Sequence, residues 1–190
     1  MVSKDRTRSD ALAKRDALAA EWRNEQSRAL PSFVDALGVP SGALVSGFLP
    51  IRSEIDLQPL LAALNAKDVA LCLPVVLNRE TIVFRRYNSG FELVDTGFGT
   101  RGPGLGAETV DPDVMLMPLA AFDDHGNRLG YGAGHYDRAI ARLIAKGKRP
   151  RLIGCAFACQ RVERISAETH DVPLDAVLTE EGLTHFQREA

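Results

Sequence analysis

Residues 114–144, VMLMPLAAFDDHGNRLGYGAGHYDRAIARLI, hold the order of elements that decides the fold. The apolar run 114–119 is too short for a membrane span and is bounded by turn residues, so it predicts a buried strand. Turn-forming residues follow it, namely Asp123, Asp124, Gly126 and Asn127. Three alternating glycines come next, and a helix is then predicted to begin near Tyr136. Its apolar side chains share one face: Ala139, Ile140, Leu143 and Ile144.

A strand, a glycine loop and a helix start present backbone N–H groups at the positive end of a helix, where anions bind. Asp137 in the first helical turn would repel a phosphate, and a Mg²⁺ ion between the two removes that conflict. Arg128, just before the loop, can hold a phosphate through two hydrogen bonds. The stretch therefore indicates a Mg²⁺–nucleotide site. The alternative is an ordinary tight turn in which Asp137 only favours the helix start, because neither standard nucleotide-binding motif is present.

The totals are those of an ordinary globular protein: 190 residues, 45% hydrophobic, 25% charged, and a net charge of −2. This charge provides no broad basic field, so nucleic acid is not an expected partner. No apolar run approaches about 18 residues, so no membrane partner is expected either. Three cysteines give no disulfide framework, and Cys155 and Cys159 are expected in the core rather than on a metal. We expect a cytoplasmic protein that is a monomer or a weak dimer.

The rest of the chain alternates predicted strands and helices. Residues 3–30 contain no Gly or Pro and predict one long helix, and a second helix should follow a cap at Asp56. Strands are predicted at 44–49, 69–76, 81–87 and 151–158, with a last one beginning at Asp175, whereas 91–113 should be irregular. The pattern predicts an α/β fold over 1–190. It should be a single-domain, three-layer, Rossmann-like sandwich with a largely parallel sheet, on which the N-terminal helix packs.

Residues 118–137 resemble the signature of the 5-formyltetrahydrofolate cyclo-ligases, P-x-x-A-F-D-x-x-G-x-R-[LI]-G-x-G-x-G-x-Y-D. Every fixed position of this pattern is met, from Pro118 through Arg128 to Asp137. LPIRSEIDLQPLL at 49–61, FACQ at 157–160 and ETHDVPLDAVLTE at 168–180 are also similar to family segments. One segment departs from the family: GTRGP at 99–103 lacks the usual Glu-Pro, so no ligand contact is assigned there.

The resemblance implies ATP contacts at the N-terminal helix and along the glycine loop. Lys4 and Arg8 correspond to basic residues that grip phosphates in the family, although from charge alone they would be a solvated helix end. Arg128 and Asp137 are the implied catalytic residues. The implied ATP-binding residues of the loop are Arg128, Leu129, Gly130, Tyr131, Gly132, Ala133, Gly134, His135 and Tyr136.

The resemblance also implies a reduced-folate site and a metal site. Leu49 and Glu54 correspond to folate contacts, and a carboxylate suits the paired N–H donors of a pterin ring. From position alone, Glu54 would be a surface charge at a helix entry. Asp137 and Asp171 are the implied Mg²⁺ pair, although Asp171 alone could merely cap a turn. The loop residues implied to line the folate site are Tyr131, Gly132, Ala133, Gly134 and His135.

The activity implied by the resemblance is ATP-dependent conversion of 5-formyltetrahydrofolate to 5,10-methenyltetrahydrofolate, with release of ADP and phosphate. Phosphoryl transfer to the formyl oxygen would create a leaving group, after which the ring closes. Two alternatives remain open from the sequence. One is another ATP-dependent enzyme whose altered 99–106 loop accepts a different substrate. The other is a folate- or nucleotide-binding protein without catalysis.

Overall fold

Five parallel strands form the centre of the fold in the computed structural model, which describes residues 3–88, 92–97, 99–166, 168 and 171–187. In sheet order they are β11 (Ala176–Thr179), β10 (Arg151–Cys155), β7 (Val114–Pro118), β1 (Leu44–Ser46) and β2 (Ala70–Val76). Antiparallel strands extend both edges: β12 (Gly182–His185) pairs with β11, and β3 (Ile82–Tyr87) with β6 (Thr109–Val110) continues beyond β2. The prediction of a largely parallel sheet is confirmed.

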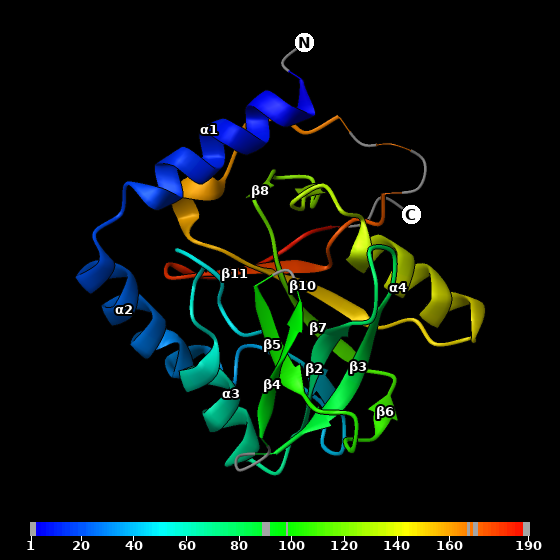
Figure 1. Cartoon of the computed structure of the whole chain (residues 1–190). Coiled ribbons are helices and arrows are strands. Elements are labelled where there is room, and N and C mark those ends of the chain that lie inside the picture. The colour runs from blue at the N-terminus through cyan, green and yellow to red at the C-terminus, as the bar shows by residue number, and fades with distance from the viewer. Residues whose placement is uncertain (1–2, 89–91, 98, 167, 169–170, 188–190) are drawn as a thin grey trace.

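Helices cover both faces of this sheet, which gives the predicted three layers (Figure 1). On one face, a 3-10 turn η1 (Leu30–Phe33) and α3 (Gln58–Asn65) bury leucines in one core with sheet residues such as Val45 and Leu116, and α2 (Ala20–Ala29) packs Trp22 against that core. The other face is covered by α4 (His135–Ala145), whose Ala139, Ile140 and Leu143 pack in a second core. The predicted apolar face of α4 is narrower than expected, because Ile144 is 45% exposed.

The predicted single helix over 3–30 is wrong. It is two helices, α1 (Lys4–Asp16) and α2, separated at residues 17–19 although no Gly or Pro is present there. Tertiary contacts override the high helix propensity of this stretch. Leu18 packs against the main core, and its carbonyl accepts a hydrogen bond from the Arg23 side chain instead of from a helical N–H. The break turns α1 away from α2 and across the top of the sheet (Figure 1).

The segment predicted to be irregular contains a hairpin, β4 (Leu93–Gly97) with β5 (Thr100–Pro103), followed by β6. Gly97 and Gly99, at φ 84° and 75°, supply the left-handed backbone at its turn. Strand β12 was not predicted either, and most observed strands are shorter than the predicted ones. Asp56 lies one residue before the N-cap of α3, Leu57, and its Oδ1 accepts a hydrogen bond from the first helical N–H, that of Gln58, at 2.9 Å. Phe91, Thr169 and His170, which belong to segments named above, lie outside the described residues.

The strand order reverses at β1, which has β2 on one side and β7 on the other. Open α/β sheets bind ligands beyond the carboxyl ends of their strands at such a point. The β1–α3 loop, which carries Glu54, leaves from this end. The chain after β7 leaves from the same end and forms the small hairpin of β8 (Ala121–Phe122) and β9 (Arg128–Leu129), followed by the glycine loop. The sheet thus directs both segments to one place.

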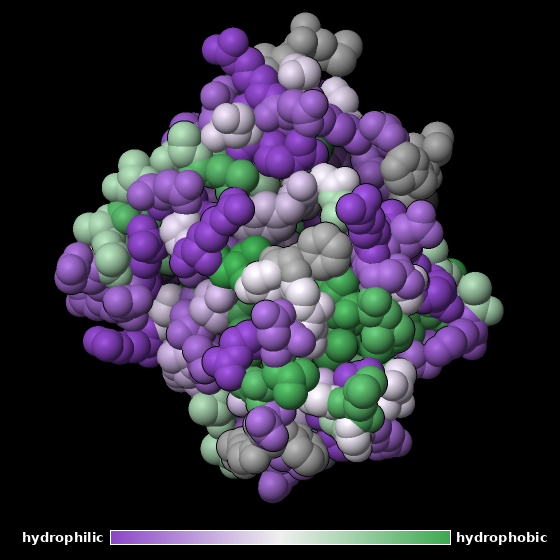
Figure 2. Space-filling view, in the orientation of Figure 1, coloured by the Kyte–Doolittle hydropathy of each residue, from purple (hydrophilic) through white to green (hydrophobic). Residues whose placement is uncertain are grey.

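The surface over α1 and α2 is mostly hydrophilic in Figure 2. Hydrophobic patches lie lower in this view, near the β4–β5 hairpin and between β3 and α4. Within the described part of the chain, no helix combines the length and the apolar character needed to cross a bilayer.

Candidate active site

The glycine loop joins β9 directly to α4 and is exposed from Gly130 to Ala133. Gly134 is the N-cap of α4 and has φ 65°, a left-handed backbone that favours glycine. A Cβ added there would lie only 2.8 Å from the Arg138 guanidinium. Within the described residues no side chain caps α4, so its amino-terminal end faces the loop with its positive dipole.

Helix α1 brings two basic residues to this loop. Arg8 Nε donates to the carbonyl of Gly130 at 2.8 Å, and the guanidinium also lies beside Gly132. Lys4 Nζ contacts Glu168 Oε1 at 2.8 Å and Asp171 Oδ2 at 3.0 Å, and these two contacts raise the pKa of Lys4. The two side chains are only 28% and 21% exposed. Both side chains are therefore held by later segments of the chain, unlike a freely solvated helix end.

The two acidic residues predicted at the metal are each paired with a cation. Asp137 forms an ion pair with Arg128, whose side chain is 7% exposed and also donates to the carbonyl of Val172. Asp171 pairs with Lys4 and accepts from the backbone N–H of Glu168 at 2.9 Å. Among the described residues, no three His, Cys, Asp or Glu side chains gather in a ready-made metal cluster. A metal that bound both carboxylates would take its remaining ligands from phosphate oxygens and water, which is an ordinary Mg²⁺ set.

Glu54 is buried, at 9% exposure, and the alternative of a surface helix-entry charge is therefore wrong. Its Oε1 accepts from the Tyr131 hydroxyl at 2.5 Å, and its Oε2 accepts from the backbone N–H of Ile51 at 2.9 Å. Burial raises the pKa of Glu54 above its usual 4.5, against the opposing effect of these hydrogen bonds. Leu49, the other predicted folate contact, is half-buried against the main core. The Tyr131 hydrogen bond joins Glu54 to the glycine loop.

The remaining predicted residues divide between the site and its surroundings. Tyr136 has a buried hydroxyl with no hydrogen-bond partner among the described residues, and burial raises its pKa. A buried orphan hydroxyl beside the loop can serve a bound ligand. His135 instead contacts the β2–β3 turn, where its Nε2 lies 2.8 Å from the Arg79 carbonyl.

The sequence of this chain matches one known enzyme family over most of its length. The model of the 5-formyltetrahydrofolate cyclo-ligase family matches residues 1–180. The chain belongs to this family. It is accordingly an enzyme of the ligase class.

Relatives of the cyclo-ligase family cover nearly the whole chain. The 5-formyltetrahydrofolate cyclo-ligase of Escherichia coli K12 is 34% identical over 173 residues, covering 87% of this chain and 94% of the relative. That of Mycolicibacterium smegmatis is 33% identical over 186 residues, covering 93% of both. The solution structure of Aquifex aeolicus 5,10-methenyltetrahydrofolate synthetase superposes with a TM-score of 0.78 at 30% identity, over 98% of this chain and 94% of that one.

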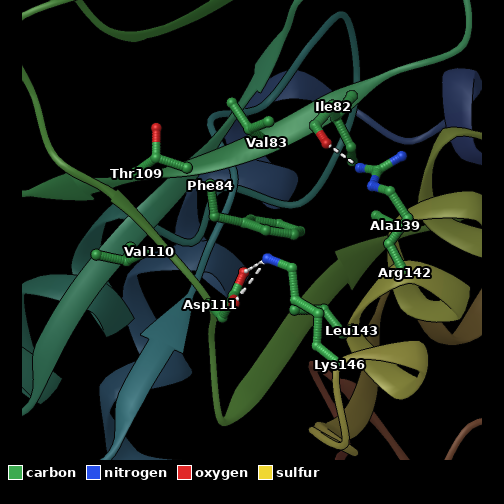
Figure 3. A pocket seen from close by; sticks show the side chains of 10 residues that line it. All are labelled: Ile82, Val83, Phe84, Thr109, Val110, Asp111, Ala139, Arg142, Leu143 and Lys146. Carbon is green, nitrogen blue, oxygen red and sulfur yellow. Dashed lines mark hydrogen bonds and ion pairs between the residues drawn. The ribbon is translucent and has the colours of Figure 1, made fainter.

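Two hollows elsewhere on this cyclo-ligase family member do not suit its substrates. One, of about 60 Å³, lies between β3, β6 and α4 and is bordered by the ion pair of Lys146 with Asp111 (Figure 3). The other, of about 220 Å³, lies beside η1 and α3. Pockets for nucleotide-sized ligands are usually about 300–1,000 Å³, so neither is assigned to a substrate.

Sequence reasoning missed three residues that the structure adds to the site. Arg15 of α1 is buried and donates to the Tyr131 hydroxyl, while Ser53 and Asp16 are hydrogen-bonded beside it. Arg15 lies in a helix with many charged residues, and nothing in its local pattern distinguishes it from a solvated arginine. Two cysteines, in contrast, are placed as expected: Cys155 lies in the core and Cys159 is half-buried against it.

Proposed function

We propose that the protein converts 5-formyltetrahydrofolate to 5,10-methenyltetrahydrofolate with ATP and Mg²⁺, releasing ADP and phosphate. One observation carries the proposal beyond the family assignment: adjacent residues of the glycine loop contact the folate anchor and the phosphate clamp. Tyr131 is hydrogen-bonded to Glu54, and Gly130 to Arg8. A folate held at Glu54 and a triphosphate held at Arg8 would therefore meet at the loop.

The reaction requires such a meeting. A formyl oxygen is a poor leaving group, so direct loss of water during ring closure is difficult. Transfer of the γ-phosphoryl group forms a phosphorus–oxygen bond to the formyl oxygen and breaks the bond to ADP. Folate N10 then attacks the formyl carbon and loses its proton, and phosphate departs with the oxygen. The protein supplies mainly alignment and charge neutralisation, which dominate catalysis of phosphoryl transfer.

The basic side chains can supply that neutralisation once their present ion pairs open. Lys4 and Arg128 now contact Asp171 and Asp137, respectively. We assign Lys4, Arg8 and Arg128 to the phosphates, and the two aspartates to Mg²⁺. Asp137 and Asp171 would hold the metal, which would supply further neutralisation of the phosphate charge.

The test is absorbance of purified protein mixed with ATP, Mg²⁺ and 5-formyltetrahydrofolate. The methenyl chromophore should grow only when all three are present. An enzyme of the same fold with another substrate would transfer the phosphoryl group of ATP to that substrate or to water. It would form no methenyl chromophore. A binding protein would bind folate or ATP in calorimetry without turnover. Either result would overturn the proposed reaction.

The free thiols of all three cysteines favour a cytoplasmic location, where such thiols stay reduced.

A further inference from the structure

Arg15 is a buried cation that the proposed reaction does not use. Only 1% of the residue is exposed. Its Nε donates to Ser53 Oγ at 2.9 Å, its Nη1 donates to Tyr131 Oη at 2.5 Å, and its Cζ lies 5.8 Å from the centre of the Tyr131 ring. One guanidinium thus ties α1 to both the β1–α3 loop and the glycine loop.

Each hydroxyl that Arg15 contacts passes a hydrogen bond on to a carboxylate. Tyr131 donates to Glu54, and Ser53 donates to Asp16. Arg15 itself lies 3.6 Å from Asp16 Oδ1. Hydrogen bonds in such a chain polarise one another, so the Tyr131 hydroxyl becomes a stronger donor to Glu54 when Arg15 donates to it.

Stability alone is a weak reason for this arrangement. Replacing a buried ion pair by apolar residues is often neutral or stabilising, because both charges must be desolvated. The indirect contact of Arg15 with Glu54 through Tyr131 has an advantage for ligand binding instead. A bidentate contact with Arg15 would take one acceptor position on each oxygen of Glu54 in addition to the one that the Ile51 N–H takes. Tyr131 takes only one position, on Oε1, in addition to the Ile51 N–H on Oε2. A carboxylate offers about four acceptor positions, so acceptors remain for a ligand.

We propose that Arg15 is a positioning residue for the reduced folate: it fixes the Tyr131 hydroxyl and thereby aims Glu54 at the substrate. This inference rests on the proposed function, because it takes Glu54 as the folate anchor. Burial raises the pKa of Glu54, and the nearby charge of Arg15 opposes that rise. Arg52 on the same loop, and Tyr131 and Tyr136 from the other side, are the further titratable groups that interact with that carboxylate.

The geometry explains why lysine should not substitute. Arginine has five donors in a rigid planar fork, so Nε and Nη1 can reach Ser53 and Tyr131 in different directions. A lysine ammonium is a point charge on a flexible stem and cannot hold both hydroxyls in the same way. Arg15→Lys therefore keeps the charge and removes the positioning.

The experiment compares Arg15→Lys, Tyr131→Phe and the double variant. Calorimetry gives the Kd for 5-formyltetrahydrofolate, and chromophore growth gives KM for both substrates and kcat. Each single change should raise the folate Kd and KM about tenfold, which corresponds to about 1.4 kcal/mol, with a much smaller change in the KM for ATP. Because Arg15 acts through Tyr131, the double variant should be little worse than the weaker-binding single variant.

Arg85→Lys is the matched control, since Arg85 is 7% exposed and donates to the Pro103 carbonyl, and it belongs to none of these contacts. It should destabilise the fold without changing the folate Kd. If Arg15→Lys does not fold, Ser53→Ala takes its place: it removes one anchor of Arg15 and should raise the folate Kd severalfold.

An unchanged folate Kd in Arg15→Lys, or in its substitute Ser53→Ala, would overturn the positioning role. Additive effects in the double variant would overturn it as well, because Arg15 would then act independently of Tyr131. A wild-type protein that binds folate but forms no chromophore would overturn only the proposed reaction. Its folate Kd would still measure the effect of Arg15. A wild-type protein that binds no folate would overturn both.

Discussion

Replacing Glu54 by Gln should weaken folate binding and leave the stability of the fold nearly unchanged. The carboxylate accepts from Tyr131 on one oxygen and from the Ile51 N–H on the other. An amide has a single oxygen, so its NH₂ group must face one of these two donors. If the oxygen keeps the Ile51 N–H, the Tyr131 proton loses its acceptor while Arg15 still donates to that hydroxyl.

The magnitudes favour a large effect on binding and a small one on folding. Losing a hydrogen bond to a charged acceptor costs about 1.5–3 kcal/mol. The raised pKa of Glu54 works in the opposite direction for stability: the folded state binds its proton more tightly than the unfolded chain does. Stability from this group is therefore present below about pH 4.5 and is lost as the pH rises through the folded pKa. Neutral Gln removes the cost of burying a charge at pH 7, so the two effects largely offset each other.

Folate binding has no such offset, because the pterin N–H donors lose a charged acceptor. We expect the KM for 5-formyltetrahydrofolate to rise at least about tenfold, or about 1.4 kcal/mol, while the KM for ATP barely changes. Initial rates of chromophore growth at varied concentrations of each substrate measure both constants, and thermal unfolding measures stability. An unchanged folate KM would place the folate elsewhere. Equal losses for both substrates would mean that Glu54 supports the whole loop rather than the folate.

Four further predictions concern the metal, the phosphates, the pH dependence of folate binding and the packing of the core. Asp137→Asn should lose most of kcat and alter the Mg²⁺ dependence while the protein stays folded, because this half-buried residue lies at a loop–helix junction; unchanged Mg²⁺ titrations would remove the metal assignment. Lys4→Ala combined with Arg8→Ala should raise the KM for ATP, each lost charge-assisted contact costing about 1.5–3 kcal/mol; a normal value would return them to a solvated helix end. Folate affinity should fall as the pH drops through the raised pKa of Glu54, with a midpoint above pH 4.5. A midpoint at or below pH 4.5 would contradict the effect of burial on this carboxyl group. Gly154→Ala should cost about 1–3 kcal/mol of unfolding free energy, since its Cβ would lie 2.6 and 2.7 Å from two leucine side chains; an unchanged denaturation midpoint would show that the core yields there.

Matched variants isolate these effects. Asp124→Asn removes an exposed carboxylate that pairs with Arg161, and it should leave the Mg²⁺ dependence unchanged. Lys67→Ala removes a lysine in a surface ion pair and should not alter the KM for ATP. Gly106→Ala adds a methyl group where no heavy atom lies within 4 Å, so stability should barely change.

Features set by local sequence were the ones that could be predicted. The strand, glycine loop and helix around residue 130 depend on apolar period, glycine conformation and helix amphipathicity over short distances. The expectation that Glu54 follows a strand end was correct for the same reason, since β1 does end just before that loop. Parallel pairing followed from the alternation of strands and helices.

Features set by distant contacts were missed. The break between α1 and α2 depends on Leu18 packing into a core built by later residues, against a local preference for helix. Arg15 resembles its charged neighbours in sequence, and its burial exists only because residues 38 and 116 positions further along accept its donors. The β4–β5 hairpin was hidden for another reason: glycines favour irregular structure on average, yet here two of them make the turn.

Helix α1 is synthesised long before some of the residues that it contacts. It leaves the ribosome before the rest of the described chain, yet two of its contacts are with residues 122 and 167 positions later, Gly130 for Arg8 and Asp171 for Lys4. Domain-sized chains emerge at about 5–20 residues per second, so these partners appear roughly 6–35 seconds after the helix does. A nascent chain stopped before residue 171 can have most of the central sheet but not this ion pair. The N-terminal side of the proposed nucleotide site is therefore complete only when almost the whole chain has been made.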